Sequence, residues 1–203
     1  MNHKIAVVDR NQLTEYEVKN VLQLLLTSFA DKFSKVHLTT TEKLTTLLYF
    51  EQQYPPSQTG PTDYIVKNEH EIIGVLSISK KSAMPKKIAY PFELSRTYGF
   101  FTIFKYVVLL TALEYSPGDN EHYIENIAVH QKYQKQGIAK ALITVAQAEV
   151  KKGEKLTLLV SATNQHALRL YLKCGFSIVK KKRKVILGLL ANEANWLFME
   201  WGR

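Results

Sequence analysis

The stretch Tyr123–Lys140, reading YIENIAVHQKYQKQGIAK, predicts a strand, a polar loop and a helix in immediate succession. Residues 123–129 are rich in strand formers, and their alternation places two sets of side chains on opposite faces: Tyr123, Glu125, Ile127 and Val129 against Ile124, Asn126 and Ala128. Residues 130–136 contain no aliphatic side chain and form the loop. Gly137 opens a repeat of three or four residues, typical of a helix with one mostly apolar face: Ile138, Leu142, Val145 and Glu149.

The entrance of this helix has the features of an anion-binding site. The first turn of any helix leaves backbone N–H groups without intrahelical partners, and the helix dipole adds partial positive charge there. Lys132, Lys135 and Lys140 surround the same turn. A phosphorylated ligand fits this combination. An ordinary strand-to-helix connection with surface lysines fits it equally well, because one glycine is weak evidence.

Residues 127–139 resemble the acetyl-CoA motif of the GNAT superfamily of N-acetyltransferases. The resemblance lies in the sequence Ile-Ala-Val at 127–129, followed after four residues by Gln-x-x-Gly-x-Ala at 134–139. In that family the end of the strand pairs with the pantetheine arm of CoA, and the loop amides hold the pyrophosphate. The resemblance implies a pantetheine contact by Ile127, Ala128 and Val129, and a pyrophosphate contact by Gln134, Lys135, Gln136, Gly137, Ile138, Ala139 and Lys140.

A second motif, NQHALRLYLKCGF at residues 164–176, predicts a helix over 165–173 that Gly175 ends. Asn164 is placed to cap this helix, and Tyr171 lies nearly two turns further on, so both side chains fall on one face. The stretch resembles a family pattern at Asn164, Ala167, Leu170, Tyr171, Gly175 and Phe176. The resemblance implies that Asn164 helps to hold the pantetheine arm and that Tyr171 lies near the thioester sulfur as general acid.

These side chains suit direct transfer of an acetyl group from the thioester to an amine. The leaving thiolate must collect a proton, and a phenol with a pKa of about 10 can donate one at pH 7. The alternative for Tyr171 is a tyrosine that only fills the core. A backbone N–H near Val129 would polarise the carbonyl. Glu125 would accept the proton of the incoming ammonium, directly or through water, unless it is a structural carboxylate. Some family members place that glutamate on the next strand, where this chain has Leu159.

Length and composition indicate a single globular domain over residues 1–203. Hydrophobic residues make up 46% of the chain and charged residues 22%, an ordinary balance. No apolar run approaches the roughly 18 residues of a membrane span. We expect no signal peptide and no membrane contact, and hence a cytoplasmic protein. Cys174 is the only cysteine and the six histidines form no metal-binding spacing, so neither a disulfide nor a metal site is expected.

The net charge of +9 is concentrated in the second part of the chain. Residues 1–120 carry 13 Lys and Arg against 12 Asp and Glu, whereas residues 121–203 carry 14 against 6. A polyanionic cofactor explains part of this excess, and a nucleic-acid-binding or CoA-sensing regulatory module is the rival explanation. The run KKKRK at 180–184 fits a nucleic-acid patch, or a strand edge protected by lysines. No aromatic residue is interleaved with it, which disfavours nucleic-acid binding.

The remaining pattern completes an α/β fold. Further elements are predicted as strands over 4–9, 63–67, 71–79 and 156–160, and as helices over 11–33 and from the N-cap Thr41 to Tyr54. Asn68, a residue type that tolerates a positive φ, is expected in a turn over residues 68–70. Gly153 is expected to end the helix that begins after Gly137. Residues 196–201 resemble the last strand of the family. Together with the resemblance, these elements predict the GNAT fold, a mixed central sheet of about six or seven strands flanked by helices.

Residues 81–115 are expected as a helical insertion, because family members usually join the flanking strands by a short turn. One or two helices over residues 92–113 would pack over the sheet by an apolar stripe: Tyr98, Phe101, Phe104, Val108 and Leu109. The insertion is a candidate lid or substrate wall, or only part of the core.

The acceptor is left open by the resemblance, since substrates of the family range from small-molecule amines to protein amines. Four acidic residues weakly favour a cationic acceptor: Glu114, Asp119, Glu121 and Glu125. The sequence decides neither whether a longer acyl-CoA is used nor whether the protein forms a homodimer.

Overall fold

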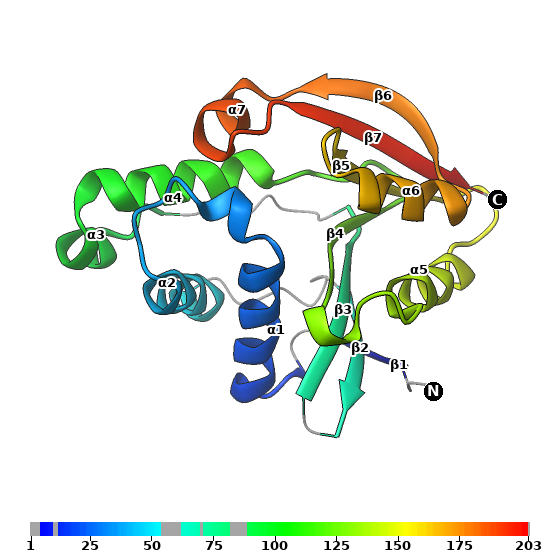
Figure 1. Cartoon of the computed structure of the whole chain (residues 1–203), viewed down its shortest axis with the longest axis horizontal. Coiled ribbons are helices and arrows are strands. Elements are labelled where there is room, and N and C mark those ends of the chain that lie inside the picture. The colour runs from blue at the N-terminus through cyan, green and yellow to red at the C-terminus, as the bar shows by residue number, and fades with distance from the viewer. Residues whose placement is uncertain (1–4, 10–11, 54–61, 70, 82–88, 203) are drawn as a thin grey trace.

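The computed structural model of the chain describes residues 5–9, 12–53, 62–69, 71–81 and 89–202. Within them, seven strands form one sheet with helices on both faces (Figure 1). In chain order the elements are β1 (Ile5–Asp9), α1 (Glu15–Ser28), the 3-10 helix η2 (Ala30–Phe33), α2 (Thr40–Gln53), β2 (Thr62–Asn68), β3 (Glu71–Ser79), α3 (Phe92–Tyr98), α4 (Phe100–Leu113), β4 (Glu121–Val129), the 3-10 helix η3 (Gln131–Tyr133), α5 (Ile138–Ala148), β5 (Lys155–Ser161), α6 (Gln165–Lys173), β6 (Ser177–Arg183), α7 (Val185–Ala191) and β7 (Asn195–Gly202). No described helix has the length and apolar character needed to cross a membrane.

The sheet has the strand order β1-β2-β3-β4-β5-β7-β6 and is mixed, which confirms the predicted fold class. Strands β1 to β4 follow one another antiparallel, and β7 is antiparallel to both β5 and β6. The pair β4 and β5 is parallel, as the crossover through α5 requires. This pair is also short, since only residues 121–124 are in register with residues 155–158.

A β-bulge interrupts β4 at Glu125. Ser77 of β3 pairs with Asn126 and Ile78 pairs with Ile124, so Glu125 is the extra residue of β4 at this point. An extra residue in one strand shifts the alternation of side chains beyond it. The predicted grouping of Tyr123 with Ile127 is therefore wrong: the register places Ile124 on the face of Ile127, and Tyr123 on the opposite face.

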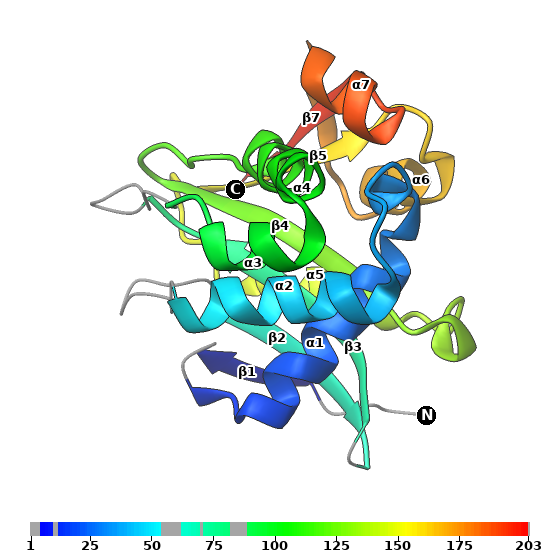
Figure 2. The same cartoon turned by 90° about the vertical axis from the view of Figure 1, so that its left-hand side faces the viewer.

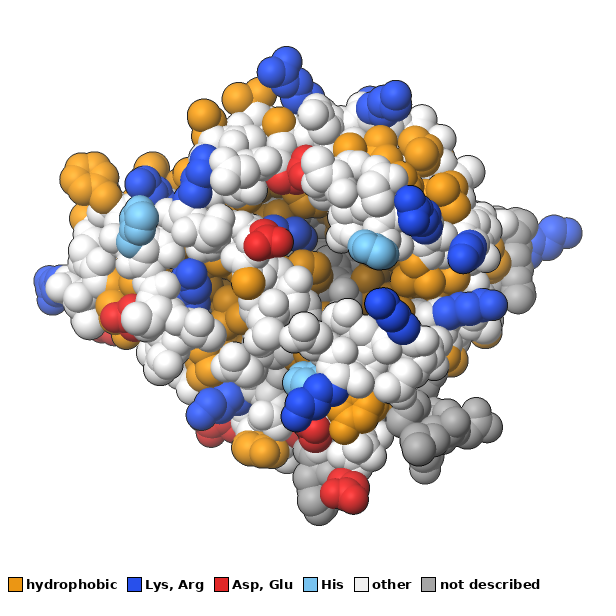
Figure 3. All heavy atoms as spheres, viewed as in Figure 1, with side chains coloured by type: hydrophobic (Ala, Val, Ile, Leu, Met, Phe, Trp, Pro, Cys, Tyr) orange, Lys and Arg blue, Asp and Glu red, His pale blue; other side chains and the backbone are white. Residues whose placement is uncertain are grey.

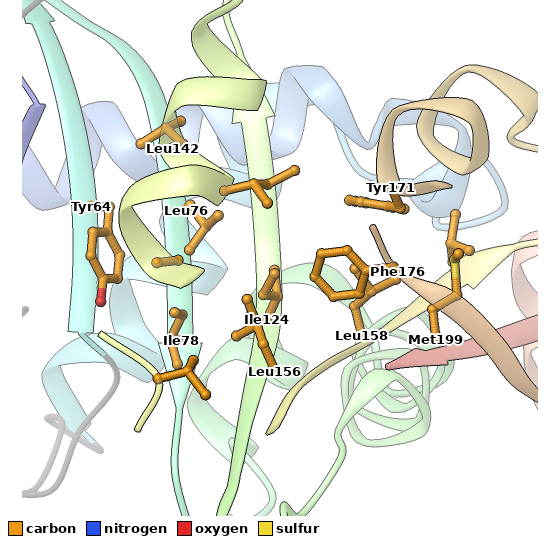
Figure 4. Close-up of a cluster of buried hydrophobic side chains, with 14 of the residues drawn as sticks. Tyr64, Leu76, Ile78, Ile124, Leu142, Leu156, Leu158, Tyr171, Phe176 and Met199 are labelled. Carbon is orange, nitrogen blue, oxygen red and sulfur yellow. The ribbon is translucent and has the colours of Figure 1, made fainter. Parts of the chain in front are cut away.

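Two layers of helices bury the two faces of the sheet. On one face, α5 contacts β2, β3 and β4, and side chains of α5 and α6 join the largest core cluster. Figure 4 shows part of this cluster, with Leu142 of α5 near Leu76, and Tyr171 and Phe176 near Leu158. On the other face, α1 contacts β3 and β4, and helices α1 to α4 lie in front of the sheet in Figure 2 with α5 behind it. Burial on both faces explains the nearly continuous apolar sequence of β3.

Capping boxes, rather than the predicted residues, start α1 and α2. Thr14 caps α1: its hydroxyl accepts a hydrogen bond from Glu17 N at 3.3 Å, and its own N–H donates to the Glu17 carboxylate at 2.9 Å. Thr39 and Glu42 repeat this arrangement at α2 with distances of 3.2 and 2.7 Å. The predicted cap Thr41 is wrong by two positions, and the single helix predicted over 11–33 divides into α1 and η2 at Phe29.

Two predicted turn residues also differ. In the β2–β3 turn the positive φ belongs to Glu69, at 54°, rather than to Asn68, which is still in β2. Helix α5 ends at Ala148 with Glu149 as its C-cap, so Gly153 belongs to the turn before β5. Residues 185–191, for which no element is predicted, form α7.

The insertion between β3 and β4 contains two helices, α3 and α4, separated at Gly99 with φ of 86°. Within α4 the buried side chains are Ile103, Tyr106 and Leu109, whereas Phe101 is 78% exposed. The predicted stripe is confirmed at Leu109 and wrong at Phe101 and Phe104, because α4 is apolar on nearly every side and its sequence does not select a face. The side chains of α4 pack with those of α1, α2 and α7 and with Trp196 of β7. Residues 82–88 of the predicted insertion lie outside the described residues.

Candidate active site

The sheet opens where β4 and β5 part. Beyond Ile124 and Leu158 the two strands no longer pair, although β4 continues against β3 to Val129 and β5 continues against β7 to Ser161. Residues 125–129 therefore have β3 on one side and no described strand on the other. Such an unpaired strand edge offers backbone groups to an extended ligand.

The loop after β4 is held in place by its own polar groups. His130 N donates to Ile73 O at 2.8 Å, and the side-chain amide of Gln134 donates to Val129 O at 3.1 Å. Gln136 closes the turn from the other end, since its amide donates to Lys132 O at 3.3 Å. The Gln134 side chain thus ties the loop back to the end of the strand, a structural role beyond the ligand contact predicted for it.

The loop and the first turn of α5 present a row of free backbone donors. No described residue accepts a hydrogen bond from the N–H groups of residues 135–140. Lys135 and Gly137 have φ of 61° and 84°, which turns consecutive N–H groups toward the same side. A Cβ on Gly137 would meet no atom within 4 Å, so the space in front of these donors is open. The row fits a polyanion such as a pyrophosphate.

The three residues predicted to face the pantetheine do not share one face. Ile127 and Val129 are partly buried and pack against the α5 and α6 core, whereas Ala128 is buried in the cluster under α1. Their backbone borders the opening nonetheless. Ala128 can contact a ligand in the opening only through its backbone.

Tyr171 and Asn164 lie on α6, beside the opening. Asn164 caps the helix as predicted, because its Oδ1 accepts a hydrogen bond from Ala167 N at 3.1 Å. Tyr171 is buried, its ring makes an edge contact with Phe176 at 5.9 Å between centroids, and no described residue hydrogen-bonds to its hydroxyl. Burial raises the pKa of Tyr171 above its usual value. Its phenol therefore stays protonated at neutral pH and has a proton to donate.

Tyr123 is a residue near this site that sequence reasoning missed. Burial raises its pKa, and smaller electrostatic contributions come from Glu125, Tyr115, Tyr171 and Glu121. The charges of Glu125 and Tyr171 therefore both act on Tyr123. The carboxylate of Glu125 is exposed. The sequence predicts that Tyr123 belongs to the strand that ends at the opening, but the face of the sheet on which its side chain lies depends on the bulge.

Two of the acidic residues that favoured a cationic acceptor form hydrogen bonds or an ion pair with other residues of the protein. Buried Glu121 accepts hydrogen bonds from Tyr115 Oη at 3.0 Å, Gly118 N at 2.7 Å and Thr157 Oγ1 at 2.6 Å. Asp119 forms an exposed ion pair with Lys81 at 2.8 Å. Glu121 and Asp119 thus have partners within the protein, and a cationic acceptor stays a prediction from the sequence.

Residues 180–183 of the lysine run belong to β6, which is the edge strand of the sheet, as one of the two interpretations of the run predicted, and Lys184 follows the strand directly. Lys182 and Lys184 are partly buried, whereas Lys181 and Arg183 are exposed. The alternation of a strand therefore divides the run into two rows of different environment.

Metal ligation and cysteine chemistry have no geometric support in the described part of the chain. No group of three or more His, Cys, Asp or Glu side chains there could hold a metal ion. Cys174 is a free, partly buried thiol whose pKa is raised by burial, which is unfavourable for a nucleophile. A separate cleft of about 650 Å³ lies between α1 and His130 and Tyr133, but no predicted catalytic or cofactor residue lines it.

The chain is similar to a known family and to solved structures. The sequence model of the acetyltransferase (GNAT) family matches residues 22–176. Similar folds include a histone acetyltransferase HPA2 and related acetyltransferase from Corynebacterium glutamicum (16% identity, 100% of this chain and 97% of that chain, TM-score 0.66), an acetyltransferase from Bacillus subtilis in complex with CoA (16%, 100% and 99%, 0.54) and an IAA acetyltransferase from Bacillus cereus (15%, 98% and 98%, 0.53). No curated protein matches the chain in sequence.

Proposed function

Because the chain belongs to the acetyltransferase (GNAT) family and is an acetyl-CoA-dependent acetyltransferase, we propose that it transfers the acetyl group to a primary amine by direct attack. The observation that carries the proposal is the row of free N–H groups at residues 135–140, beside the opening between β4 and β5. The row suits the pyrophosphate of the donor, and the opening suits its extended arm.

In this proposal the donor lies along β4 and across the start of α5. The pyrophosphate is held by the loop and the first helical turn, largely through backbone donors: Gln134, Lys135, Gln136, Gly137, Ile138, Ala139 and Lys140. The pantetheine arm follows the free edge of Ile127, Ala128 and Val129. Asn164 contributes its side-chain NH₂ group from the other side of the opening, since its oxygen is engaged in the helix cap.

The proposed reaction needs one proton donor and one proton acceptor. The neutral amine attacks the thioester carbon, and collapse of the tetrahedral intermediate breaks the C–S bond. Tyr171, which burial keeps protonated at neutral pH, donates its phenolic proton to the departing thiolate. The nitrogen carries an extra proton after the attack and returns it through water to the Tyr171 phenolate, which restores the phenol. A backbone N–H near Val129 stabilises the oxyanion.

Glu125 is proposed to take the proton that the incoming ammonium must lose. Two observations support this role: its exposed position in the bulge at the edge of the opening, and its electrostatic influence on Tyr123. A bulge at such a place re-aims a side chain that a regular strand would direct elsewhere.

The test is the thermal midpoint of the protein with and without excess acetyl-CoA, beside a matched trial with a short DNA duplex. A ligand that binds only the folded state raises stability by about 2.7 kcal/mol at a hundredfold excess over Kd. We expect a rise with acetyl-CoA alone, followed by release of CoA thiol when primary amines are screened.

A rise with DNA and none with acetyl-CoA would contradict the proposal. It would favour the rival function, a nucleic-acid-binding module that uses the basic second part of the chain. A rise with acetyl-CoA but no acetylation of any small-molecule or protein amine would favour a CoA sensor instead.

A further inference from the structure

Three lysine side chains gather on the α1 side of the sheet, with the carboxylate of Glu121 near Lys182. The Nζ atom of Lys32, in η2, lies 4.1 Å from the ring centroid of Phe29 and 5.4 Å from that of Trp196. Lys182 of β6 lies over Phe198 and Tyr115, at 4.5 and 4.8 Å. Lys184 donates a hydrogen bond to Ala112 O at the end of α4, at 2.8 Å. No described residue forms an ion pair with any of the three.

These lysines are close enough to affect one another. Burial lowers the pKa of Lys32 to about 8, and the charge of Lys184 lowers it further. The pKa of Lys184 is lowered by burial and then by Lys182. Gathering three ammonium groups in a partly buried place costs free energy, because desolvation and mutual repulsion both oppose it, and Glu121 offsets part of this cost at Lys182. Aromatic rings offset only part of this cost.

Aromatic contacts connect the lysines to the active-site opening. The ring of Tyr115, which lies under Lys182, is 4.4 Å from the ring of Tyr123, and the pKa of Tyr123 is affected by both Glu125 and Tyr171. The side chain of Trp196 joins Lys32 to the same strand, β7, on which Phe198 contacts Tyr115. Figure 3 shows this side of the molecule hollowed between α1 and α6, with hydrophobic side chains inside and charged side chains around the rim.

We propose that Lys32, Lys182 and Lys184 bind an anionic group of the acetyl acceptor, so that the acceptor is a primary amine that also carries a carboxylate or a phosphate. This inference rests on the proposed function and narrows its substrate class. The ammonium groups supply hydrogen-bond donors and charge for the anion, and the neighbouring rings form an apolar wall. Glu121 accepts three hydrogen bonds from the protein, and its charge acts on Lys182, so Lys32 and Lys184 supply most of the attraction for the anion.

Matched pairs of acceptors test the proposal by activity. Release of CoA thiol from acetyl-CoA is measured with amino acids and their carboxamides, and with phosphoethanolamine and ethanolamine. We expect the anionic member of the preferred pair to have a KM at least about tenfold lower, the order expected for hydrogen bonds to charged groups. The better of the two pairs identifies carboxylate or phosphate as the anion.

Single variants assign the preference to the lysines. Lys32→Met and Lys184→Met should remove it, mainly through KM, whereas Lys181→Met, exposed on the same strand, should keep it. The proposal is overturned if no pair shows a preference for the anionic member, or if the preference survives in both Lys32→Met and Lys184→Met.

A second measurement does not depend on turnover. The Cε resonance of Lys32 is followed by NMR in protein with ¹³C-labelled lysine and saturating acetyl-CoA, with assignment by Lys32→Met, while sodium acetate or inorganic phosphate is added. We expect a saturable change and a higher pKa of Lys32 with one of these anions. If no amine is acetylated, the proposed function fails, yet such a change still supports the anion site. An unchanged Lys32 resonance with both anions overturns the site whatever the activity.

Discussion

The donor side and the acceptor side of the opening acquire their polarity in different ways. On the donor side, residues 135–140 form one continuous segment whose backbone N–H groups have no acceptor among the described residues. On the proposed acceptor side, Lys32 and the pair Lys182 and Lys184 come from distant parts of the chain and approach one another only after the tertiary structure has formed. A binding site made of backbone N–H groups can therefore be predicted from a short stretch of sequence, whereas a binding site made of side chains from distant segments depends on the tertiary structure.

The largest effect is expected from a charge placed in the row of backbone donors. Gly137→Glu should weaken acetyl-CoA binding by about a hundredfold or more, because a carboxylate near the phosphates costs about 1 to 4 kcal/mol and the variant also strains a residue with φ of 84°. The measurement is Kd by calorimetry. Gly153→Glu is the matched control, since Gly153 has φ of 86° and equally open surroundings. Equal losses in both variants would mean that strain alone acts and that the row does not bind the donor.

The next effect separates binding from chemistry at Tyr171. Tyr171→Phe should leave the Kd for acetyl-CoA unchanged and lower kcat about a hundredfold, because the thiolate loses its proton donor. Since burial raises the pKa of Tyr171, the wild-type rate should show no loss from ionisation of this phenol up to about pH 10. Tyr106→Phe is the control, a buried tyrosine in another core cluster. Comparable turnover by Tyr171→Phe at every pH would contradict the role of general acid.

The strand, loop and helix of the donor side could be predicted because local rules determine them. Residues 123–129 are a strand, residues 165–173 are a helix capped by Asn164, and Gly137 precedes α5, as the sequence indicates. Side-chain alternation, helical spacing and cap chemistry act over a few residues, so nothing distant was needed to interpret them.

What the sequence could not supply depends on contacts between distant segments. The bulge at Glu125 arises from pairing with β3, and it alone decides the face of Tyr123. The buried side of α4 depends on α1, α2 and α7, because the helix is apolar almost all round. The run KKKRK reads as one charge patch in sequence, yet strand geometry separates Lys182 and Lys184 from their exposed neighbours.

A smaller effect should appear in the pH dependence of stability. Lys32 loses its proton near pH 8 in the folded chain and near 10.5 when unfolded, so the unfolded state binds more protons between these values. The free energy of unfolding attributable to Lys32 should therefore rise with pH over this window, by about 2 kcal/mol. Urea unfolding at pH 7.5 and pH 10 measures it as the difference between wild type and Lys32→Met. The control Lys181→Met should follow wild type, and identical pH dependence in wild type and Lys32→Met would exclude a desolvated ammonium.

The smallest effect tests which residues fix the start of α2. Leu44 of this helix packs in the same core cluster as Tyr106. Thr39→Ala removes the hydroxyl that accepts from Glu42 N and should lower the free energy of unfolding by about 1 kcal/mol. Thr41→Ala changes the residue that sequence alone favours as the cap, but this threonine lies within α2, where alanine has the higher helix propensity, so stability should be unchanged or slightly higher. Urea unfolding of the two variants at pH 7 measures the contrast. Both substitutions remove a hydroxyl and a methyl group, two residues apart in the chain. Equal losses of stability would mean that α2 does not begin at Thr39. A loss of stability in Thr39→Ala alone would show that the pair Thr39 and Glu42 fixes where this helix begins.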